Sequence, residues 1–117
     1  MDWTPFTEPG QIEEIKAQSH SAFVLIFKHS HRCSISSVAL HRLQAKWNLT
    51  SLQIHPYKLN VITARAISQE VAGTFGVRHE SPQILLIKNG ECIMHLSHLD
   101  ISYSRITSAI DDKELAD

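Results

Sequence analysis

Residues 22–36 read AFVLIFKHSHRCSIS, an apolar run that passes through a polar segment into a new apolar pattern. The apolar residues Ala22–Phe27 include β-branched and aromatic side chains, which is typical of a strand buried on both faces. We therefore expect this strand at the centre of a sheet flanked by helices. A polar loop over Lys28–Arg32 follows, and a helix is predicted over Cys33–Trp47. The apolar stripe of that helix would consist of Ile35, Val38, Ala39, Leu43 and Trp47.

Alternating strands and helices are predicted on both sides of this unit. A short extended segment at residues 3–7 precedes a helix that ends at Ser19–Ser21, and Leu52–Val61 has the pattern of a strand. Pro56 lies inside that strand and favours an edge position or a displaced start, because proline cannot donate a hydrogen bond to a neighbouring strand. The later elements are a helix, two strands and a helix over Ile67–Phe75, Gln83–Lys88, Glu91–Leu96 and Ser102–Ile110.

Local turn and cap residues support this order. Gly76 suits the left-handed position that ends a helix, and Asn89–Gly90 is typical of a two-residue hairpin turn. Ser102 is a good N-cap, and the polar tail from Asp111 to Asp117 is expected to fray. Together the elements predict an α/β fold in which helices flank a mixed central β-sheet.

Composition and charge restrict the function classes. A length of 117 residues predicts one domain over residues 1–117, and four glycines and four prolines exclude a collagen-like or low-complexity chain. Eleven basic residues balance twelve acidic ones for a net charge of -1, which excludes a strongly basic nucleic-acid surface. No apolar run approaches the ~20 residues that span a bilayer, and the first residues lack a secretory pattern. We therefore expect a cytoplasmic protein without nucleic-acid or membrane partners.

One cysteine stands where chemistry is expected. Cys33 follows the buried strand and opens the predicted helix, so the free N–H groups and the positive dipole end of the first turn favour its thiolate form. Lys28 and Arg32 add positive charge nearby, His31 does so when protonated, and residues 23–47 contain no acid. A thiolate is the nucleophile that attacks a disulfide. We therefore predict a reactive Cys33 that Arg32 and His31 tune.

Ser36 lies three positions after Cys33, where a dithiol motif would hold its second cysteine. Its hydroxyl can donate a hydrogen bond to the thiolate but cannot form a disulfide, so exchange at this motif must be monothiol. The other cysteine, Cys92, is expected to be a small buried hydrophobic residue, with a resolving or regulatory thiol as the alternative. Ser81–Pro82 precedes a hydrophobic strand, and these residues alone favour a trans peptide bond.

Several segments of the chain resemble the YtxJ-like family, the monothiol bacilliredoxins of the thioredoxin-like superfamily. The resemblance runs from Trp3 to Ile110, and its most specific piece is the His-Glu-Ser-Pro-Gln segment at residues 79–83. The segments that carry it are Phe27–Ser30, Cys33–Ser36, Tyr57–Arg65, Phe75–Gln83, Ile84–Gly90 and Ser97–His98. The resemblance implies a thioredoxin-like fold.

The resemblance also implies a site and a reaction. A cis Ser81–Pro82 bond would face Cys33, and the Ser81 backbone would pair with substrate. Cys33 would attack a mixed disulfide between a protein and bacillithiol, a low-molecular-weight thiol that serves as co-substrate, with no cofactor. The protein thiol would leave, Cys33 would carry the bacillithiol adduct, and a second thiol would release it. The implied partners are bacillithiol and bacillithiolated proteins.

Two features bear on how closely the chain follows this family. The family usually has proline directly after the cysteine, whereas this chain has Ser34, which restores an N–H and adds a hydroxyl. Arg78 and His79 are candidates to bind the malate carboxylates of bacillithiol. Glu80 works against a simple anion site there, and a salt-bridged surface loop is the alternative for this segment.

Other functions are weighed against this one. A non-catalytic thioredoxin-fold binding or stress-response module is the alternative for the whole chain. A metal site at His29, His31 and Cys33 is not favoured, because the spacing is not that of a structural zinc site. His95 and His98 are expected to be surface or hydrogen-bonded residues. We therefore assign no metal.

Overall fold

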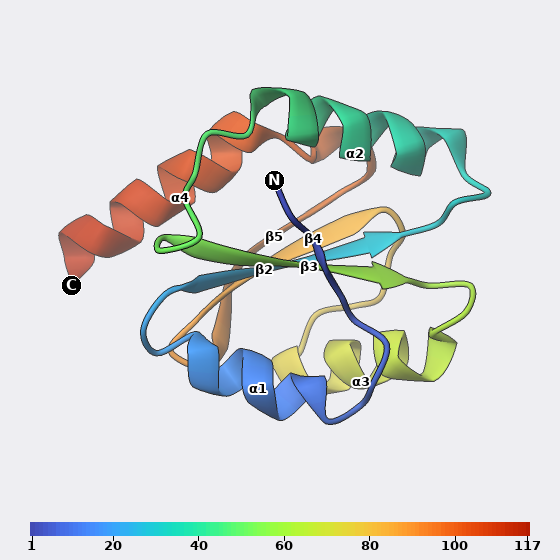
Figure 1. Ribbon diagram of the computed structural model, residues 1–117, viewed down its shortest axis with the longest axis horizontal. Coiled ribbons are helices and arrows are strands. Elements are labelled where there is room, and N and C mark those ends of the chain that lie inside the picture. The colour runs from blue at the N-terminus through green and yellow to red at the C-terminus, as the bar shows by residue number, and fades with distance from the viewer.

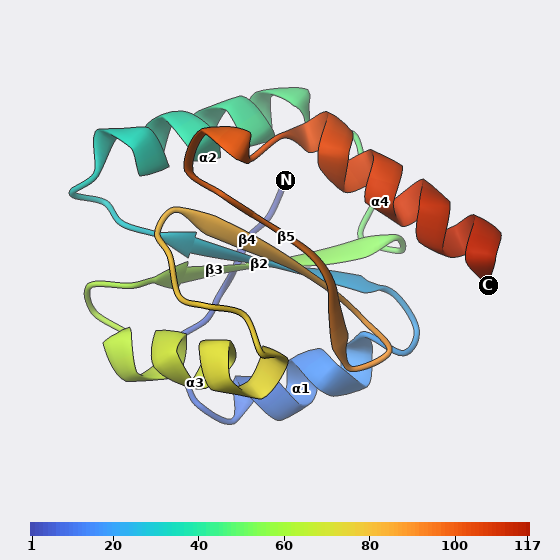
Figure 2. The ribbon, with the colours of Figure 1, turned by 180° about the vertical axis from the view of Figure 1, so that it is seen from behind.

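A five-stranded sheet lies between two layers of helices in the computed structural model, which describes residues 1–117 (Figure 1 and Figure 2). The strands are β1 (Thr4–Pro5), β2 (Phe23–His29), β3 (Ile54–Asn60), β4 (Gln83–Lys88) and β5 (Glu91–Ser97). The helices are α1 (Gln11–Gln18), α2 (Ser34–Lys46), α3 (Arg65–Phe75), the 3-10 turn η1 (His98–Asp100) and α4 (Tyr103–Ala116). The strand order is β1-β3-β2-β4-β5, parallel across β1, β3 and β2 and antiparallel from β2 to β5, which confirms the predicted mixed sheet.

The central strand β2 is buried on both faces. All of its residues from Phe23 to Lys28 are buried, and its neighbours are β3 on one side and β4 on the other. Helices α1 and α3 cover one face of the sheet, and α2 and α4 cover the other (Figure 1). The central position predicted from the apolar run is confirmed. Lys28, which was expected in the following loop, instead belongs to the strand.

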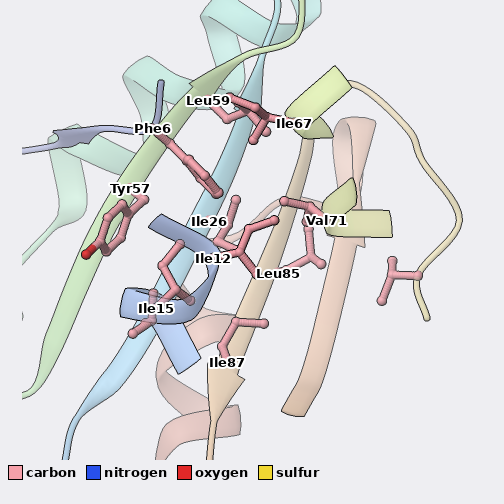
Figure 3. Packing of buried hydrophobic residues seen from close by; sticks show 12 residues of the cluster. Phe6, Ile12, Ile15, Ile26, Tyr57, Leu59, Ile67, Val71, Leu85 and Ile87 are labelled. Atoms are coloured by element: carbon pink, nitrogen blue, oxygen red, sulfur yellow. The ribbon is translucent and has the colours of Figure 1, made fainter. Parts of the chain in front are cut away.

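Two hydrophobic cores form because side chains alternate between the faces of a strand. Figure 3 shows the core beneath α1 and α3, where Ile26 of β2 and Leu85 of β4 lie among side chains from both helices. That core contains Phe6, Ile12, Ile15, Val24, Ile26, Tyr57, Leu59, Ile67, Val71, Val77, Leu85 and Ile87. The core toward α2 and α4 contains Phe23, Leu25, Phe27, Ala39, Leu43, Ile54, Ile84, Leu86, Ile106 and Ile110.

The predicted turns and caps are confirmed by the backbone. Gly76 ends α3 with a φ of 67°, in the left-handed region that glycine adopts without strain. Asn89 and Gly90 have φ values of 54° and 77°, as a two-residue turn between β4 and β5 requires. The Ser102 hydroxyl accepts a hydrogen bond from the Arg105 amide at 3.4 Å and so caps α4.

The predicted apolar stripe of α2 is partly wrong. Ile35 and Val38 are 43% and 50% exposed, whereas Ser36, Ala39 and Leu43 are buried. Both sets have helical spacing, so the sequence pattern allowed either face to turn inward. The helix is rotated so that the Ser36 hydroxyl, rather than Ile35, faces the end of β2.

The polar tail does not fray as expected, because α4 continues to Ala116. Leu115 is 86% exposed, so the last turn is not held by packing. Local bonds hold it instead, since Lys113 pairs with the Asp117 carboxylate at 3.2 Å and its carbonyl accepts the Asp117 amide. None of the helices is both long and apolar enough to cross a membrane.

Strand β3 begins later than predicted, because the Gln53 amide donates to the Thr50 carbonyl in a turn. It is second in the sheet rather than at the edge, since β1 lies outside it. However, β1 pairs only with Tyr57 and Lys58, so Pro56 lies just before the paired stretch. At Pro56 the strand is locally an edge, where a missing N–H leaves no partner unsatisfied.

The buried Ser19 joins α1 to the hairpin between β4 and β5. Its hydroxyl donates to the Lys16 carbonyl at 2.6 Å and accepts from the Gly90 amide at 2.8 Å. Its own carbonyl accepts from the Asn89 amide at 2.8 Å. The tip of the hairpin is therefore held by hydrogen bonds to the end of a helix that is far away in sequence.

We expect Ser19→Ala to lower the free energy of unfolding by about 1–3 kcal/mol, because the Gly90 amide would lose its acceptor in a part-buried place. Urea unfolding followed by circular dichroism measures this change. Ser21→Ala is the matched control, because the Ser21 hydroxyl is exposed and bonds only the Gln18 carbonyl. Equal losses in the two variants would contradict the role given to Ser19.

Candidate active site

The local backbone places Cys33 at the start of α2. Strand β2 ends at His29, and Cys33 is the N-cap residue of the helix, in an extended conformation. The Cys33 amide donates to the Ser30 carbonyl, and the Cys33 carbonyl accepts from Ser37, but its side chain makes no cap hydrogen bond. The thiol is free and the residue is partly exposed. Cys33 therefore directly precedes the first-turn amides, which have no acceptor within the helix.

Ser36 is fully buried and its hydroxyl has two partners. It accepts from the Ser30 amide at 3.0 Å and lies 2.7 Å from Nδ1 of His29. Burial lowers the pKa of His29, and the positive charges of Lys58 and His31 lower it further. The neutral imidazole can then accept the Ser36 proton. These hydrogen bonds join the end of β2 to the first turn of α2, and neither of them reaches Cys33.

His31 and Arg32, the two residues expected to tune Cys33, differ in their contacts. His31 and Arg32 are exposed in the loop directly before it. Nδ1 of His31 lies 2.9 Å from the side-chain nitrogen of Asn60 on β3. Arg32 takes part in neither of the two ion pairs, which join Lys16 to Glu13 and Lys113 to Asp117. Arg32 is therefore a free positive charge one residue from the thiol.

The Ser81–Pro82 turn lies at the same end of the sheet as Cys33. Gln83, the first residue of β4, is paired with Lys28 near the end of β2. The loop before β4 and the loop after β2 leave the sheet at this end (Figure 1 and Figure 2). The Ser81–Pro82 bond is cis, so the preference for trans drawn from the residues alone is wrong. The Pro82 carbonyl accepts from His98 at 2.9 Å, which ties this turn to η1.

Ser81 presents unused polar groups in this turn. Its buried hydroxyl has no hydrogen-bond partner. Its backbone takes part in none of the hydrogen bonds of the turns and loops. Buried polar groups in proteins are nearly always paired, so unpaired ones call for an explanation.

Lys28 is buried on the face of the sheet opposite Ser36, and the sequence did not reveal this. Its ammonium donates to the Ser68 carbonyl at 3.1 Å and lies 3.1 Å from Nδ1 of His79. No carboxylate pairs with it. Burial lowers the pKa of Lys28 to about 8. Lys28 is therefore not the free positive charge beside Cys33 that was expected.

The two residues expected to bind carboxylates, Arg78 and His79, are both exposed. Nδ1 of His79 nevertheless turns inward, 3.0 Å from the Ser68 hydroxyl as well as beside Lys28. Burial lowers the pKa of His79, and the charges of Lys28 and Arg65 lower it further. A neutral His79 bound to the interior of the protein is poorly suited to hold an anion.

The second cysteine lies at the other end of the sheet. Cys92 is paired with Ile87, and Ile87 is paired with Val24 near the start of β2. From Val24 to His29 the strand rises five residues, or about 16 Å, whereas a disulfide needs Cα atoms within about 7 Å. Cys92 is partly buried, bonds the Met94 carbonyl and has its pKa raised by burial. It therefore cannot form a disulfide with Cys33 within one chain.

A comparison with known protein families assigns this chain to a family. The family described as monothiol bacilliredoxin BrxC matches residues 4–106, which include Cys33, Ser36 and the Ser81–Pro82 turn. This chain belongs to the monothiol bacilliredoxin BrxC family. The resemblance drawn from the sequence is thereby confirmed, and the family together with the fold makes the chain a thiol oxidoreductase with protein thiols as redox partners.

Solved structures confirm the thioredoxin fold. A protein described as a provisionally assigned oxidoreductase with a thioredoxin fold is 30% identical, with a TM-score of 0.77 over 90% of each chain. Thioredoxin Mala s 13 of Malassezia sympodialis is 17% identical, with a TM-score of 0.72 over 95% of this chain and 90% of its own. The short form of spinach chloroplast thioredoxin f is 13% identical, with a TM-score of 0.67 over 95% and 92%.

No group of three or more His, Cys, Asp or Glu side chains is arranged to hold a metal ion. His29 bonds Ser36 and His31 bonds Asn60, so both imidazoles near Cys33 have protein partners.

The pH dependence of stability tests the burial of Lys28. Its lowered pKa means that the folded protein releases this proton near pH 8, whereas the unfolded chain keeps it to about pH 10.5. The unfolded state binds more protons in this range, so the free energy of unfolding should rise with pH there, by about 3 kcal/mol from this group. Lys28→Met should lack that rise.

The raised pKa values of Cys92 and Tyr57 act in the opposite direction, because their alkaline forms disfavour the folded state. Both groups remain in the Lys28→Met variant, so the difference between the two proteins isolates Lys28. Urea unfolding at several pH values from 7.5 to about 10.5 measures it. A difference that stays constant over this range would contradict the assignment.

Proposed function

We propose that this chain removes bacillithiol from protein mixed disulfides and that Cys33 is its only reacting sulfur. The position of Cys33 supports this most directly. Cys33 is a partly exposed free cysteine at the N-cap of α2, while Cys92 lies at the far end of the sheet. A single accessible sulfur in this setting can exchange disulfides but cannot close an internal one.

In the first step, the Cys33 thiolate attacks the bacillithiol sulfur of the mixed disulfide. The bond between the protein sulfur and the bacillithiol sulfur breaks, and a bond between Cys33 and bacillithiol forms. The protein sulfur leaves as a thiolate and takes a proton from solvent. One disulfide is exchanged for another, so no external oxidant or reductant is needed in this step.

In the second step, a free low-molecular-weight thiol attacks the bacillithiol sulfur on Cys33. The Cys33 thiolate leaves, and the attacking thiol and bacillithiol form a soluble disulfide. Over the two steps the bacillithiol sulfur stays in a disulfide, the client sulfur is reduced to a thiol, and the second thiol is the reductant because its sulfur ends in the soluble disulfide. Bacillithiol acts as co-substrate, and the reaction uses no cofactor.

We also propose that the Ser81–Pro82 turn binds the client protein. Its backbone is unpaired at Ser81, and it lies at the end of the sheet where Cys33 lies. An extended client segment could pair with these backbone groups as an added strand does.

The proposed exchange also needs a compartment that keeps thiols reduced. We therefore propose that the protein works in the cytoplasm.

Substitution of each cysteine tests the monothiol mechanism. Cys33→Ala should abolish release of bacillithiol from a bacillithiolated client, because no other sulfur can take its place. Cys92→Ala should retain most of the activity and serves as the matched control. Release is followed by mass spectrometry of the client. A large loss of activity in Cys92→Ala would contradict the mechanism.

The alternative, a binding module without catalysis, is separated by the reactivity of Cys33. Exposure to oxidised bacillithiol should place one adduct on Cys33 and none on Cys92, as read by peptide mass spectrometry. Iodoacetamide should alkylate Cys33 at pH 7 faster than it alkylates free cysteine, because the proposed role requires a strongly nucleophilic sulfur there. Absence of an adduct together with a rate no faster than that of free cysteine would favour the binding module.

A further inference from the structure

A cavity of about 620 Å³ opens beside the loop that leads to Cys33. It lies between the N-terminal segment, which crosses next to β3 (Figure 1), and the ends of β2 and β3. Its walls include Trp3, Phe6, His29, His31, Lys58 and Asn60. Cavities of 300–1,000 Å³ with a few polar groups are typical of small-molecule sites.

The charged side chain that lines this cavity is basic, and no acidic side chain lines it. Lys58 gives it a positive charge, and the imidazoles of His29 and His31 also line it. Lys58 takes part in neither of the two ion pairs of the protein. Burial lowers the pKa of His29, and the positive charges of Lys58 and His31, which line the same cavity, lower it further. The cavity is therefore suited to an anion, and it has no protein anion to displace.

The cavity is close to the reacting sulfur. His31 is two residues before Cys33, so their Cα atoms lie within about 7.6 Å of each other. His29 bonds Ser36 in the first turn of the helix that Cys33 caps. A small molecule joined to Cys33 through a disulfide can therefore extend toward this cavity.

We propose that the cavity binds the carboxylate groups of the low-molecular-weight thiol while its sulfur is bonded to Cys33 or to the client. The ligand class is a small dicarboxylate, and Lys58 and His31 are the residues that contact it. This inference rests on the proposed function and identifies its substrate subsite. It also gives the carboxylates a different place from Arg78 and His79, since Nδ1 of His79 is bonded to the interior.

The kinetic test uses one client protein in two mixed disulfides, one with bacillithiol and one with uncharged 2-mercaptoethanol. Lys58→Gln should lower kcat/KM for the bacillithiol form by about tenfold, because a hydrogen bond to a charged group is lost. It should change kcat/KM for the 2-mercaptoethanol form little. Lys46→Gln is the matched control: it removes the same charge at the far end of α2 and should affect neither form.

Two kinetic outcomes would overturn the inference. An equal loss with both substrates would mean that Lys58 acts on folding or on Cys33 rather than on the carboxylates. No loss with either substrate would mean that the cavity is not used. Circular dichroism of the variant identifies a folding defect, and Lys58→Arg, which keeps the charge, should then restore the bacillithiol rate if the inference holds.

A binding test separates this inference from the proposed function. Malate alone is titrated into the Cys33→Ala protein, and amide shifts are recorded by NMR, with the neutral diamide of malate as the control ligand. Malate should shift the amides of His31, Lys58 and Asn60, and Lys58→Gln should abolish those shifts. If malate binds but wild-type protein releases no bacillithiol, the proposed function fails and the cavity stands. If malate shifts none of these amides, the inference is overturned whatever the activity.

Discussion

The two hydrogen bonds of the Ser36 hydroxyl determine how α2 sits on the sheet. They join the helix to His29 and to the Ser30 amide, and the Ser36 side chain itself is fully buried. Turning the helix to bury Ile35 would leave these groups without partners, which costs about 1–3 kcal/mol. The rotation that results leaves Ile35 exposed, and the same bonds hold the first turn of α2, which Cys33 precedes as N-cap, against the end of β2. The geometry around the thiol therefore depends on a neighbour that does not touch it.

Much of the fold could be predicted because its signals are local. The run Ala22–Phe27 is short, apolar at every position and rich in β-branched and aromatic residues, which favours a strand buried on both faces, and Asn89–Gly90 specifies a hairpin by its own backbone preferences. The face of α2 could not be predicted in this way. Residues 35 and 38 have the same helical spacing as residues 36 and 39, and a contact between separate elements decides between them.

The site could be predicted only where its signals are local. Cys33 could be found because a strand end followed by a helix start is visible in the sequence. Lys28 was missed, since lysine side chains usually extend to solvent. The available signal was its two-residue alternation with Val24 and Ile26, which continues onto the α1 and α3 face. The basic cavity could not be foreseen, because its walls come from segments that only the folded sheet brings together.

The separation of Cys33 from Cys92 also affects how the molecule behaves when thiols become scarce. A dithiol protein can eject a bound adduct with its own second sulfur, whereas this chain has no such sulfur within reach. In the proposed reaction, its return to the free state would depend on a thiol supplied from outside. If that supply were consumed, the protein would keep its adduct and stop, so the fraction that carries an adduct would report the remaining reducing capacity of its surroundings.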